Sequence, residues 1–442
     1  MRWCLVGGQE EADTSDKVVE VVRGKVLRVR GDQGLRGGSK FVGINYGHVD
    51  STLMSATKAV ALIKSLGVGL VRLPDANAQV LAALANSGLD VVISVRDEDI
   101  PSLAAHESRA MYWIQKNVIA FFPDTNITII DVGDNIMGSQ HPRALMAQLL
   151  PAMANLYNAL LQHDLTNLIK VTTSFSMNVF ATTFPPSLGT FRADIAQPFI
   201  VPILDFLTQT QTPLLLNVYP YLAWQNDPNH IPLSFALFDA PSVPIWLDKK
   251  LSYYNLLDVQ LDAVAYAMEN LGYPNLDIVI SKTGWPTAGG ANATMTYAFK
   301  YNQGLVNKVI ESPGTPHRPK REVPAFIYSL VDEGSTRLKW GVFKADGSMV
   351  YPLKVGQPEA GTSAQSPVMG PGTGPASARD EDSVQAPAAV SGAEDKANAA
   401  TASASALAIH GVPVPYNDNS APDPVRDDSD SSSAPPPVSG FG

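Results

Sequence analysis

Cysteine is almost absent from this 442-residue chain, in which Cys4 is the only one. A disulfide needs two cysteines and a thiolate metal site needs several, so the body of the chain can form neither. The histidines show no HxxxH spacing or comparable cluster. The sequence therefore predicts no bound metal and no cofactor.

Clusters of positive charge are missing as well. Lys and Arg number 32 against 42 Asp and Glu, which gives a formal net charge of -10. Nucleic-acid binding requires clustered cations that neutralise phosphates, so we expect no nucleic-acid partner. With 45% hydrophobic and 17% charged residues, the chain is apolar enough to bury a large core. This balance favours a globular enzyme scaffold that acts on a neutral ligand such as a sugar.

Long apolar runs are also absent, since none reaches the roughly 18 residues that indicate a membrane span. Residues 7–36 are charged and interrupted by glycines, unlike an export signal. Residues 434–442 lack the apolar tail of a lipid-anchor signal. We therefore expect no transmembrane segment, no lipid anchor and no signal peptide.

The two ends of the chain differ in composition from its middle. Residues 1–40 are charged and glycine-rich, which predicts a flexible leader. Residues 354–442 are rich in Ala, Ser, Pro and Asp and have few large apolar side chains to bury, which predicts a disordered tail. Residues 41–353 are left as the folded domain.

Within 41–353, eight short apolar runs alternate with longer stretches of helical apolar spacing. The runs are nearly continuous in apolar content, as is typical of parallel strands covered on both faces. They are Phe41–Tyr46, Gly69–Leu73, Val91–Val95, Ile127–Val132, Leu168–Thr173, Leu214–Tyr219, Ile278–Ser281 and Val323–Leu330. The expected helices are Ser51–Ser65, Ala78–Ala85, Arg109–Phe121, Arg143–Gln162, Phe199–Thr208, Asn255–Asn270 and Met295–Ile310.

Eight strand-helix units predict an α/β fold that closes into a (β/α)8 TIM barrel. A doubly wound open sheet is the alternative, but no GxGxxG turn follows the first strand. Barrel enzymes carry their reacting groups at the carboxyl ends of the strands. Those ends are polar and aromatic here, and we expect Asn45, Tyr46, Asn217, Tyr219, Trp285 and Glu333 to bind a sugar. Alternatively, the aromatic rings only pack against one another at the barrel mouth and bind no sugar.

The strand ends resemble the plant glucan endo-1,3-β-glucosidases of glycoside hydrolase family 17. The motifs that carry the resemblance are Gly43–Gly47, Val71–Leu73, Phe184–Ser187, Asn217–Tyr221, Thr283–Pro286 and Val350–Pro352. The resemblance implies a glycosidase barrel and β-1,3-glucan as the partner. It also implies an extracellular, cell-wall location, although the chain shows no signal peptide.

The resemblance further implies two catalytic glutamates, and this chain has neither. The family's Val-Gly-Asn-Glu on strand four reads Val132-Gly-Asp-Asn135, so an amide stands at the acid/base position. Its Glu-Thr-Gly-Trp-Pro on strand seven begins with Lys282 instead of the nucleophile. Retaining hydrolysis requires two carboxyl groups. We therefore expect an impaired enzyme, a pseudoenzyme that binds β-1,3-glucan.

Several alternatives remain open from the sequence. Asp134 and Glu333 are candidate displaced carboxylates of an active endo-β-1,3-glucanase, although a one-residue shift along a strand should turn Asp134 to the other face. Lys282 is expected to form an ion pair with Glu333 or Asp134. A third possibility is a structural or interaction protein with a vestigial cleft and a tail that provides the contact surface.

Overall fold

The computed structural model of the protein describes residues 41–47, 54–239, 242–311, 314–333 and 336–356. The expected leader, and the expected tail from residue 357 onward, lie outside the described residues. Residues 354–356 were assigned to that tail, but Val355 is 6% exposed and packs with the core. These three residues therefore belong to the folded domain.

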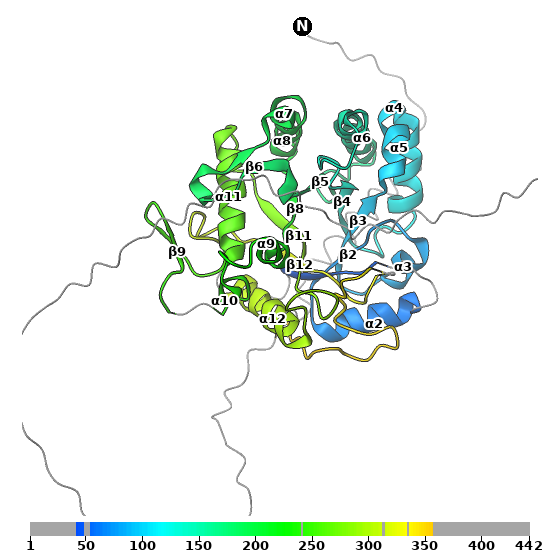
Figure 1. Ribbon diagram of the computed structural model, residues 1–442. Helices are drawn as coiled ribbons and strands as arrows, with labels where there is room; N and C mark the ends of the chain where they lie inside the picture. Colours follow the sequence, from blue (N-terminus) through cyan, green and yellow to red (C-terminus); the bar gives the residue numbers. More distant parts are fainter. Residues whose placement is uncertain (1–40, 48–53, 240–241, 312–313, 334–335, 357–442) are drawn as a thin grey trace, which may run out of the picture. The chain divides into compact units, whose positions relative to one another are not determined.

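Eight parallel strands form a closed barrel in the order β1-β12-β11-β8-β5-β4-β3-β2 (Figure 1). Their bounds are β1 Val42–Asn45, β2 Leu70–Arg72, β3 Asp90–Val95, β4 Ile127–Asp134, β5 Lys170–Ser176, β8 Leu214–Asn217, β11 Ile278–Thr283 and β12 Ala325–Ile327. Each of the eight predicted runs overlaps one of these strands, and β3, β4, β5 and β11 extend one to three residues beyond the predicted bounds. The barrel is confirmed and the open sheet is wrong, because β1 pairs with both β2 and β12.

Helices follow the strands and surround the barrel. The seven expected helices correspond to α2 Ala56–Leu66, α3 Ala78–Ala83, α5 Glu107–Ile114, α6 Arg143–Leu161, α8 Val201–Gln209, α11 Leu256–Asn270 and α12 Met295–Glu311. Local capping fixes several of their starts. The Ser55 hydroxyl accepts from the Lys58 amide at 3.3 Å, and the Asn255 side chain accepts from the Asp258 amide at 2.8 Å.

Shorter elements fill the loops at the barrel mouth and rim. They are η2 Asp97–Asp99, α4 Ile100–Ala105, η3 Gln115–Ile119, η4 Met177–Val179, η5 Pro186–Leu188, α7 Ala193–Ile195, η6 Ala196–Ile200, α9 Pro220–Asn226 and α10 Leu233–Ala236, of which η3 and η6 are π-helical. Two antiparallel hairpins pair β6 Phe180–Thr182 with β7 Thr190–Phe191 and β9 Trp246–Asp248 with β10 Leu251–Tyr253. The sequence pattern predicted none of these except η3, within the expected helix Arg109–Phe121, and the last two residues of η6, within the expected helix Phe199–Thr208.

The core has two parts. A small apolar cluster joins Val92, Leu215, Val279 and Phe326 from four strands. Because β3 is not adjacent to β8, β11 or β12 in the barrel, these side chains meet across its interior. The larger cluster fills the layer between strands and helices.

One helix in the described part of the chain, α6, is long and apolar enough to cross a membrane by length and composition. Its buried residues include Met146, Leu149, Met153 and Leu156, which recur at helical spacing on one face. That face packs with the barrel core, as expected of an outer helix of this fold.

Candidate active site

An ion pair between Lys282 and Asp134 lies at the carboxyl ends of the barrel strands. The Lys282 ammonium contacts the Asp134 Oδ2 atom, and the Lys282 side chain is only 14% exposed. The other carboxylate oxygen, Oδ1, accepts from Asn217 Nδ2 at 2.8 Å and from Ser174 Oγ at 3.3 Å. The expected ion pair of Lys282 is confirmed, with Asp134 as the partner.

The Asp134 side chain points into the site, where it meets Lys282. The expectation that it points to the opposite face of the strand is wrong. The register between β4 and β5 shifts between Asp131 and Asp134, and Gly133 has a φ of +70°. Strict alternation of side chains therefore ends before Asp134. The interactions of its carboxylate span the neighbouring strands β4, β5, β8 and β11 through Ser174, Asn217 and Lys282.

Asp134 is held as an anion. Burial raises its pKa, but the positive charges of Lys282 and Arg72 and the hydrogen bonds from Lys282 and Asn217 outweigh burial. The net result is a pKa well below the usual range of an aspartate. A carboxylate that stays ionised has no proton to donate near neutral pH. Asp134 therefore lacks the main property of a displaced general acid.

Asp97 is a site carboxyl that the sequence reading missed. It follows β3, and its Oδ1 atom accepts from the Asp134 backbone amide at 3.1 Å. Burial, with a smaller contribution from the negative charge of Asp134, raises its pKa to about 6. His141 approaches its other oxygen at 3.8 Å. An acidic residue just beyond a predicted strand end was the only signal in the sequence.

Asn135 is 3% exposed and has a left-handed φ of +60°. Its carbonyl oxygen Oδ1 accepts from the Ser176 hydroxyl at 2.6 Å and from the Ser176 amide at 3.2 Å. Its Nδ2 atom has no hydrogen-bond partner among the described residues. From Ser176 the network continues to Asn178 at 2.7 Å and then to the exposed Gln140 at 3.4 Å. This position is an amide and hydroxyl network without any carboxyl group.

Glu333 is fixed in the loop that follows β12. Its Oε1 atom accepts from the Gly47 amide at 3.1 Å and its Oε2 atom from the Tyr328 hydroxyl at 2.9 Å. Burial raises its pKa, against the lowering effect of Lys282 and these hydrogen bonds. A Cβ atom at Gly47 would lie 2.4 Å from the Glu333 Cδ atom, so any larger residue there would displace the Glu333 carboxylate. Its role in sugar binding stays a prediction.

Asn45 and Asn217 form the floor of the site and are almost fully buried. Asn45 Nδ2 donates to the Ser281 carbonyl at 3.0 Å, and its Oδ1 accepts from Arg72 at 3.3 Å. Asn217 Oδ1 accepts from the Ser281 hydroxyl at 2.8 Å. Arg72 also donates to the buried Asp131 at 2.7 Å. Both amides are thus committed to protein partners, and their contact with a sugar stays a prediction.

The expected aromatic residues are mostly covered by neighbouring protein atoms. Tyr46 and Tyr219 are each 3% exposed, and Trp285 is 0% exposed. The Trp285 ring lies 4.9 Å from that of Tyr221, and its indole nitrogen donates to the Asn292 carbonyl at 2.9 Å. Barrel-mouth packing, the alternative left open by the sequence, therefore describes Trp285 in this structure.

Two further rings at the mouth were not identified from the sequence. Trp340 lies 5.4 Å from Tyr219 and 5.8 Å from Tyr328, between ring centroids. The Lys282 ammonium lies 5.7 Å from the Tyr328 ring centroid. Tyr328 thus contacts both charged groups of this side of the site, Lys282 and Glu333. Within the described ranges, no group of three or more His, Cys, Asp or Glu side chains could hold a metal ion.

A closed parallel barrel with a polar site at its strand ends defines the class of (β/α)8 barrel proteins, many of which are enzymes. The chain belongs to glycosyl hydrolases family 17, whose family model matches residues 42–355.

Among its relatives, the probable glucan endo-1,3-beta-glucosidase A6 of Arabidopsis thaliana is 38% identical over 320 residues. That match covers 70% of this chain and 66% of the relative. Glucan endo-1,3-beta-glucosidase 7 of the same species is 38% identical over 335 residues, which is 74% of this chain and 66% of the relative. The chain thus spans slightly less than two thirds of the length of these two relatives.

The solved structures that are similar to this chain include two from plants. CJP38, a beta-1,3-glucanase and allergen of Cryptomeria japonica pollen, has a TM-score of 0.68 and 38% identity, covering 71% of this chain and 98% of that one. A plant beta-glucan endohydrolase has a TM-score of 0.66 and 34% identity, covering 71% and 100%.

Proposed function

We propose that this family 17 barrel binds a β-1,3-glucan at its mouth without hydrolysing it by the retaining mechanism. The observation that carries the proposal is the Lys282–Asp134 ion pair. By resemblance to the family, Lys282 stands at the nucleophile position and Asn135 at the acid/base position. Neither side chain is a carboxyl group, whereas the retaining mechanism needs one as acid and one as nucleophile.

The positive charge of Lys282 opposes hydrolysis in addition to the absence of the two carboxyl groups. The transition state of glycoside hydrolysis is oxocarbenium-like, so positive charge develops on the sugar. An ammonium group next to it raises the energy of that state. Loss of general-acid catalysis alone reduces rates by about 10²- to 10⁴-fold. We therefore expect negligible turnover of β-1,3-glucan.

Sugar binding is supported by the polar character of the same site. Asn178 and Gln140 carry the Asn135–Ser176 network to the surface, where their amides can bind sugar hydroxyls. The relatives named above are glucan endo-1,3-beta-glucosidases, so the substrate class comes to this chain by analogy.

The first test is laminarin hydrolysis by the full chain and by the triple variant Asp134→Asn, Asn135→Glu, Lys282→Glu. Asp134 must be changed because a glutamate at 282 would otherwise face an unpaired Asp134 carboxylate. We expect an inert parent, and a triple variant that releases reducing sugar at least about 10²-fold faster. The double variant that keeps Asp134 is the matched control and should be slower than the triple variant.

Hydrolysis by the parent would contradict the proposal, and the variants Asp97→Asn, Asp134→Asn and Glu333→Gln would then identify the displaced carboxylates. Binding is measured separately by titrating the parent with laminari-oligosaccharides. An absence of binding at concentrations of about 1 mM would leave an inert barrel and refute the binding role.

A further inference from the structure

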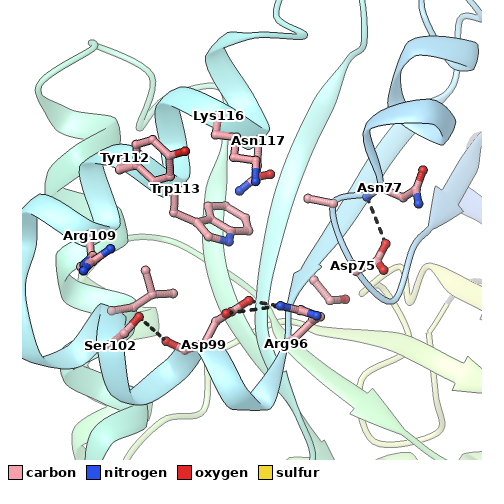
Figure 2. Close-up of a pocket in the computed structure, with 13 residues that line it drawn as sticks. Asp75, Asn77, Arg96, Asp99, Ser102, Arg109, Tyr112, Trp113, Lys116 and Asn117 are labelled. Carbon is pink, nitrogen blue, oxygen red and sulfur yellow. Dashed lines mark hydrogen bonds and ion pairs between the residues drawn. The ribbon is translucent and has the colours of Figure 1, made fainter.

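A pocket of about 350 Å³ lies outside the ion-paired site, at the rim of the barrel (Figure 2). One wall is the turn after β2, which carries Asp75 and Asn77. The end of β3 contributes Ser94 and Arg96, and the opposite wall is formed by α4, α5 and η3. None of the residues that form the Lys282–Asp134 ion pair or the Asn135 network lines it.

Several side chains of α5 and η3 line one wall of this pocket. Arg109 and Trp113 are four residues apart on one face of α5, and Lys116 follows in η3 and lines the same pocket. Asn117 extends this face within η3, a five-residue π-helical turn of a kind that often occurs at functional sites. Figure 2 shows the Trp113 ring extending from the helix toward the turn of Asp75 and Asn77.

The charges in the pocket are unevenly compensated. Arg96 pairs with Glu98 at 3.0 Å and with Asp99 at 3.3 Å. Arg109 and Lys116 line the same pocket and form no ion pair with any residue that the structure describes. Asp75 also lines the pocket, so its three cations, Arg96, Arg109 and Lys116, face two carboxylates, Asp75 and Asp99, and the lining carries a net charge of +1 in a chain of net charge -10.

These groups match one class of ligand. The flat face of Trp113 suits the apolar face of a sugar ring, and small-ligand sites typically combine such a surface with a few polar groups. Asn77, Asn117 and Ser102 can bind hydroxyl groups. Arg109 and Lys116 can bind a carboxylate through charge-assisted hydrogen bonds, which are about twice as strong as neutral ones.

We propose that this pocket binds an acidic saccharide, a sugar ring that carries a carboxylate. The ring stacks on Trp113, and a carboxylate contacts Arg109 or Lys116, whose backbones lie about 10 Å apart along the helical segment. A neutral glucan offers the two cations only hydroxyl groups, which bind them less strongly than a carboxylate does, so the pocket favours the acidic saccharide. The proposal is independent of the function assigned to the barrel mouth.

The test is isothermal titration of the full chain with trigalacturonic acid, with laminaritriose and with glucose 6-phosphate. We expect trigalacturonic acid to bind, and the double variant Arg109→Ala, Lys116→Ala to weaken its binding at least about tenfold. The matched control Lys64→Ala, Lys320→Ala removes the same charge from exposed positions elsewhere and should change the affinity less than about twofold. Trp113→Phe keeps most of the packing and should weaken binding by several-fold.

Three results would overturn the proposal. They are no binding of trigalacturonic acid up to about 10 mM, an equal loss of affinity in the control variant, or binding of glucose 6-phosphate alone. Laminaritriose binding that survives the Arg109 and Lys116 changes reports on the barrel mouth, so the failure of one proposal is distinguishable from the failure of the other.

Discussion

At the scale of single residues, Lys282 and Asp134 each depend on the other. A cation at the Lys282 position would be costly if it had no counter-charge, because its side chain is only 14% exposed. Asp134 supplies that charge, and Lys282 in turn offsets the desolvation of the aspartate. The pair therefore explains how a cation and an anion are accommodated side by side in one site.

The first prediction concerns removal of Lys282. We expect Lys282→Met to lower the free energy of unfolding at pH 7 by roughly 1 to 3 kcal/mol, because Asp134 loses its counter-ion while partly exposed to water. The control Lys300→Met breaks the exposed Lys300–Asp239 pair and should cost less than about 1 kcal/mol. Urea unfolding of both variants and the parent measures the difference.

The pH dependence of this difference follows from the lowered pKa of Asp134. Because the folded pKa lies below the unfolded value of about 4, the ion pair contributes stability that is fully present above that value. The contribution is lost as pH falls toward the folded pKa. The gap between parent and Lys282→Met should therefore narrow in acid, and a gap that widened below pH about 4 would show that Asp134 is not the titrating group.

Residue types alone predicted part of this site. The sequence predicted that residues 135 and 282 lack carboxyl groups and that Lys282 forms an ion pair. It did not reveal Asp97, Ser174, Tyr328 or Trp340, because their contacts depend on the relative register of strands far apart in the chain. It also gave the wrong direction for Asp134, since alternation assumes a regular strand.

At the scale of elements, the end of β4 determines the shape of the site. Gly133 has a φ of +70°, and the following Asn135 has a φ of +60°. Residues other than glycine rarely adopt this left-handed backbone conformation, and asparagine is among the exceptions. The irregular end of the strand turns Asp134 toward β11 and leaves Asn135 bound to Ser176.

The second prediction tests the role of this turn. We expect Gly133→Ala to lower the free energy of unfolding by roughly 2 to 4 kcal/mol, from backbone strain and from overpacking. A Cβ atom at 133 would lie 2.5 Å from the Ile136 Cγ1 atom. Gly88 has a φ of +79° but nothing within 4 Å of such an atom, so Gly88→Ala should cost only about 1 kcal/mol.

Chemical denaturation of the two alanine variants measures this difference. Equal losses would mean that the space around Gly133 relaxes and that only its φ matters. A larger loss at 133 assigns the additional cost to Ile136 and Ile100, which pack against the turn.

Long periodic elements were predictable, whereas short ones were not. The eight strands and seven main helices follow from apolar runs and helical spacing. The helix α4 of six residues and the hairpin strands of two or three residues lie in loops outside the alternating strand and helix segments, so the pattern that identified the barrel did not include them. The pocket at the rim depends on α4, which the pattern did not predict, and on the π-helical form of η3, whose residues were predicted only as part of an ordinary helix.

At the scale of the whole molecule, the barrel closes between residues near both ends of the family match. The strand β1 begins at Val42 and pairs with β12. Tyr351, Leu353 and Val355 are 4%, 3% and 6% exposed and complete the core. The Tyr351 hydroxyl also accepts from Asn302 at 2.7 Å. Residues 350–356 therefore contribute to the hydrophobic core although they form no helix or strand.

The last prediction compares two truncations. We expect a chain of residues 41–356 to unfold at the same temperature as the full chain, because the core clusters lie within this range. A chain of residues 41–349 loses three buried side chains, each worth about 1.5 to 3 kcal/mol, and should unfold roughly 10 °C lower. Thermal unfolding followed by circular dichroism measures both.

A lower midpoint for 41–356 would show that residues 1–40 or 357–442 contribute to the folded domain, against the expectation of a flexible leader and a disordered tail. The chain 41–356 alternatively keeps its midpoint but no longer recovers from an extract the proteins that bind the full chain. In that case the tail provides an interaction surface, as expected of a structural or interaction protein.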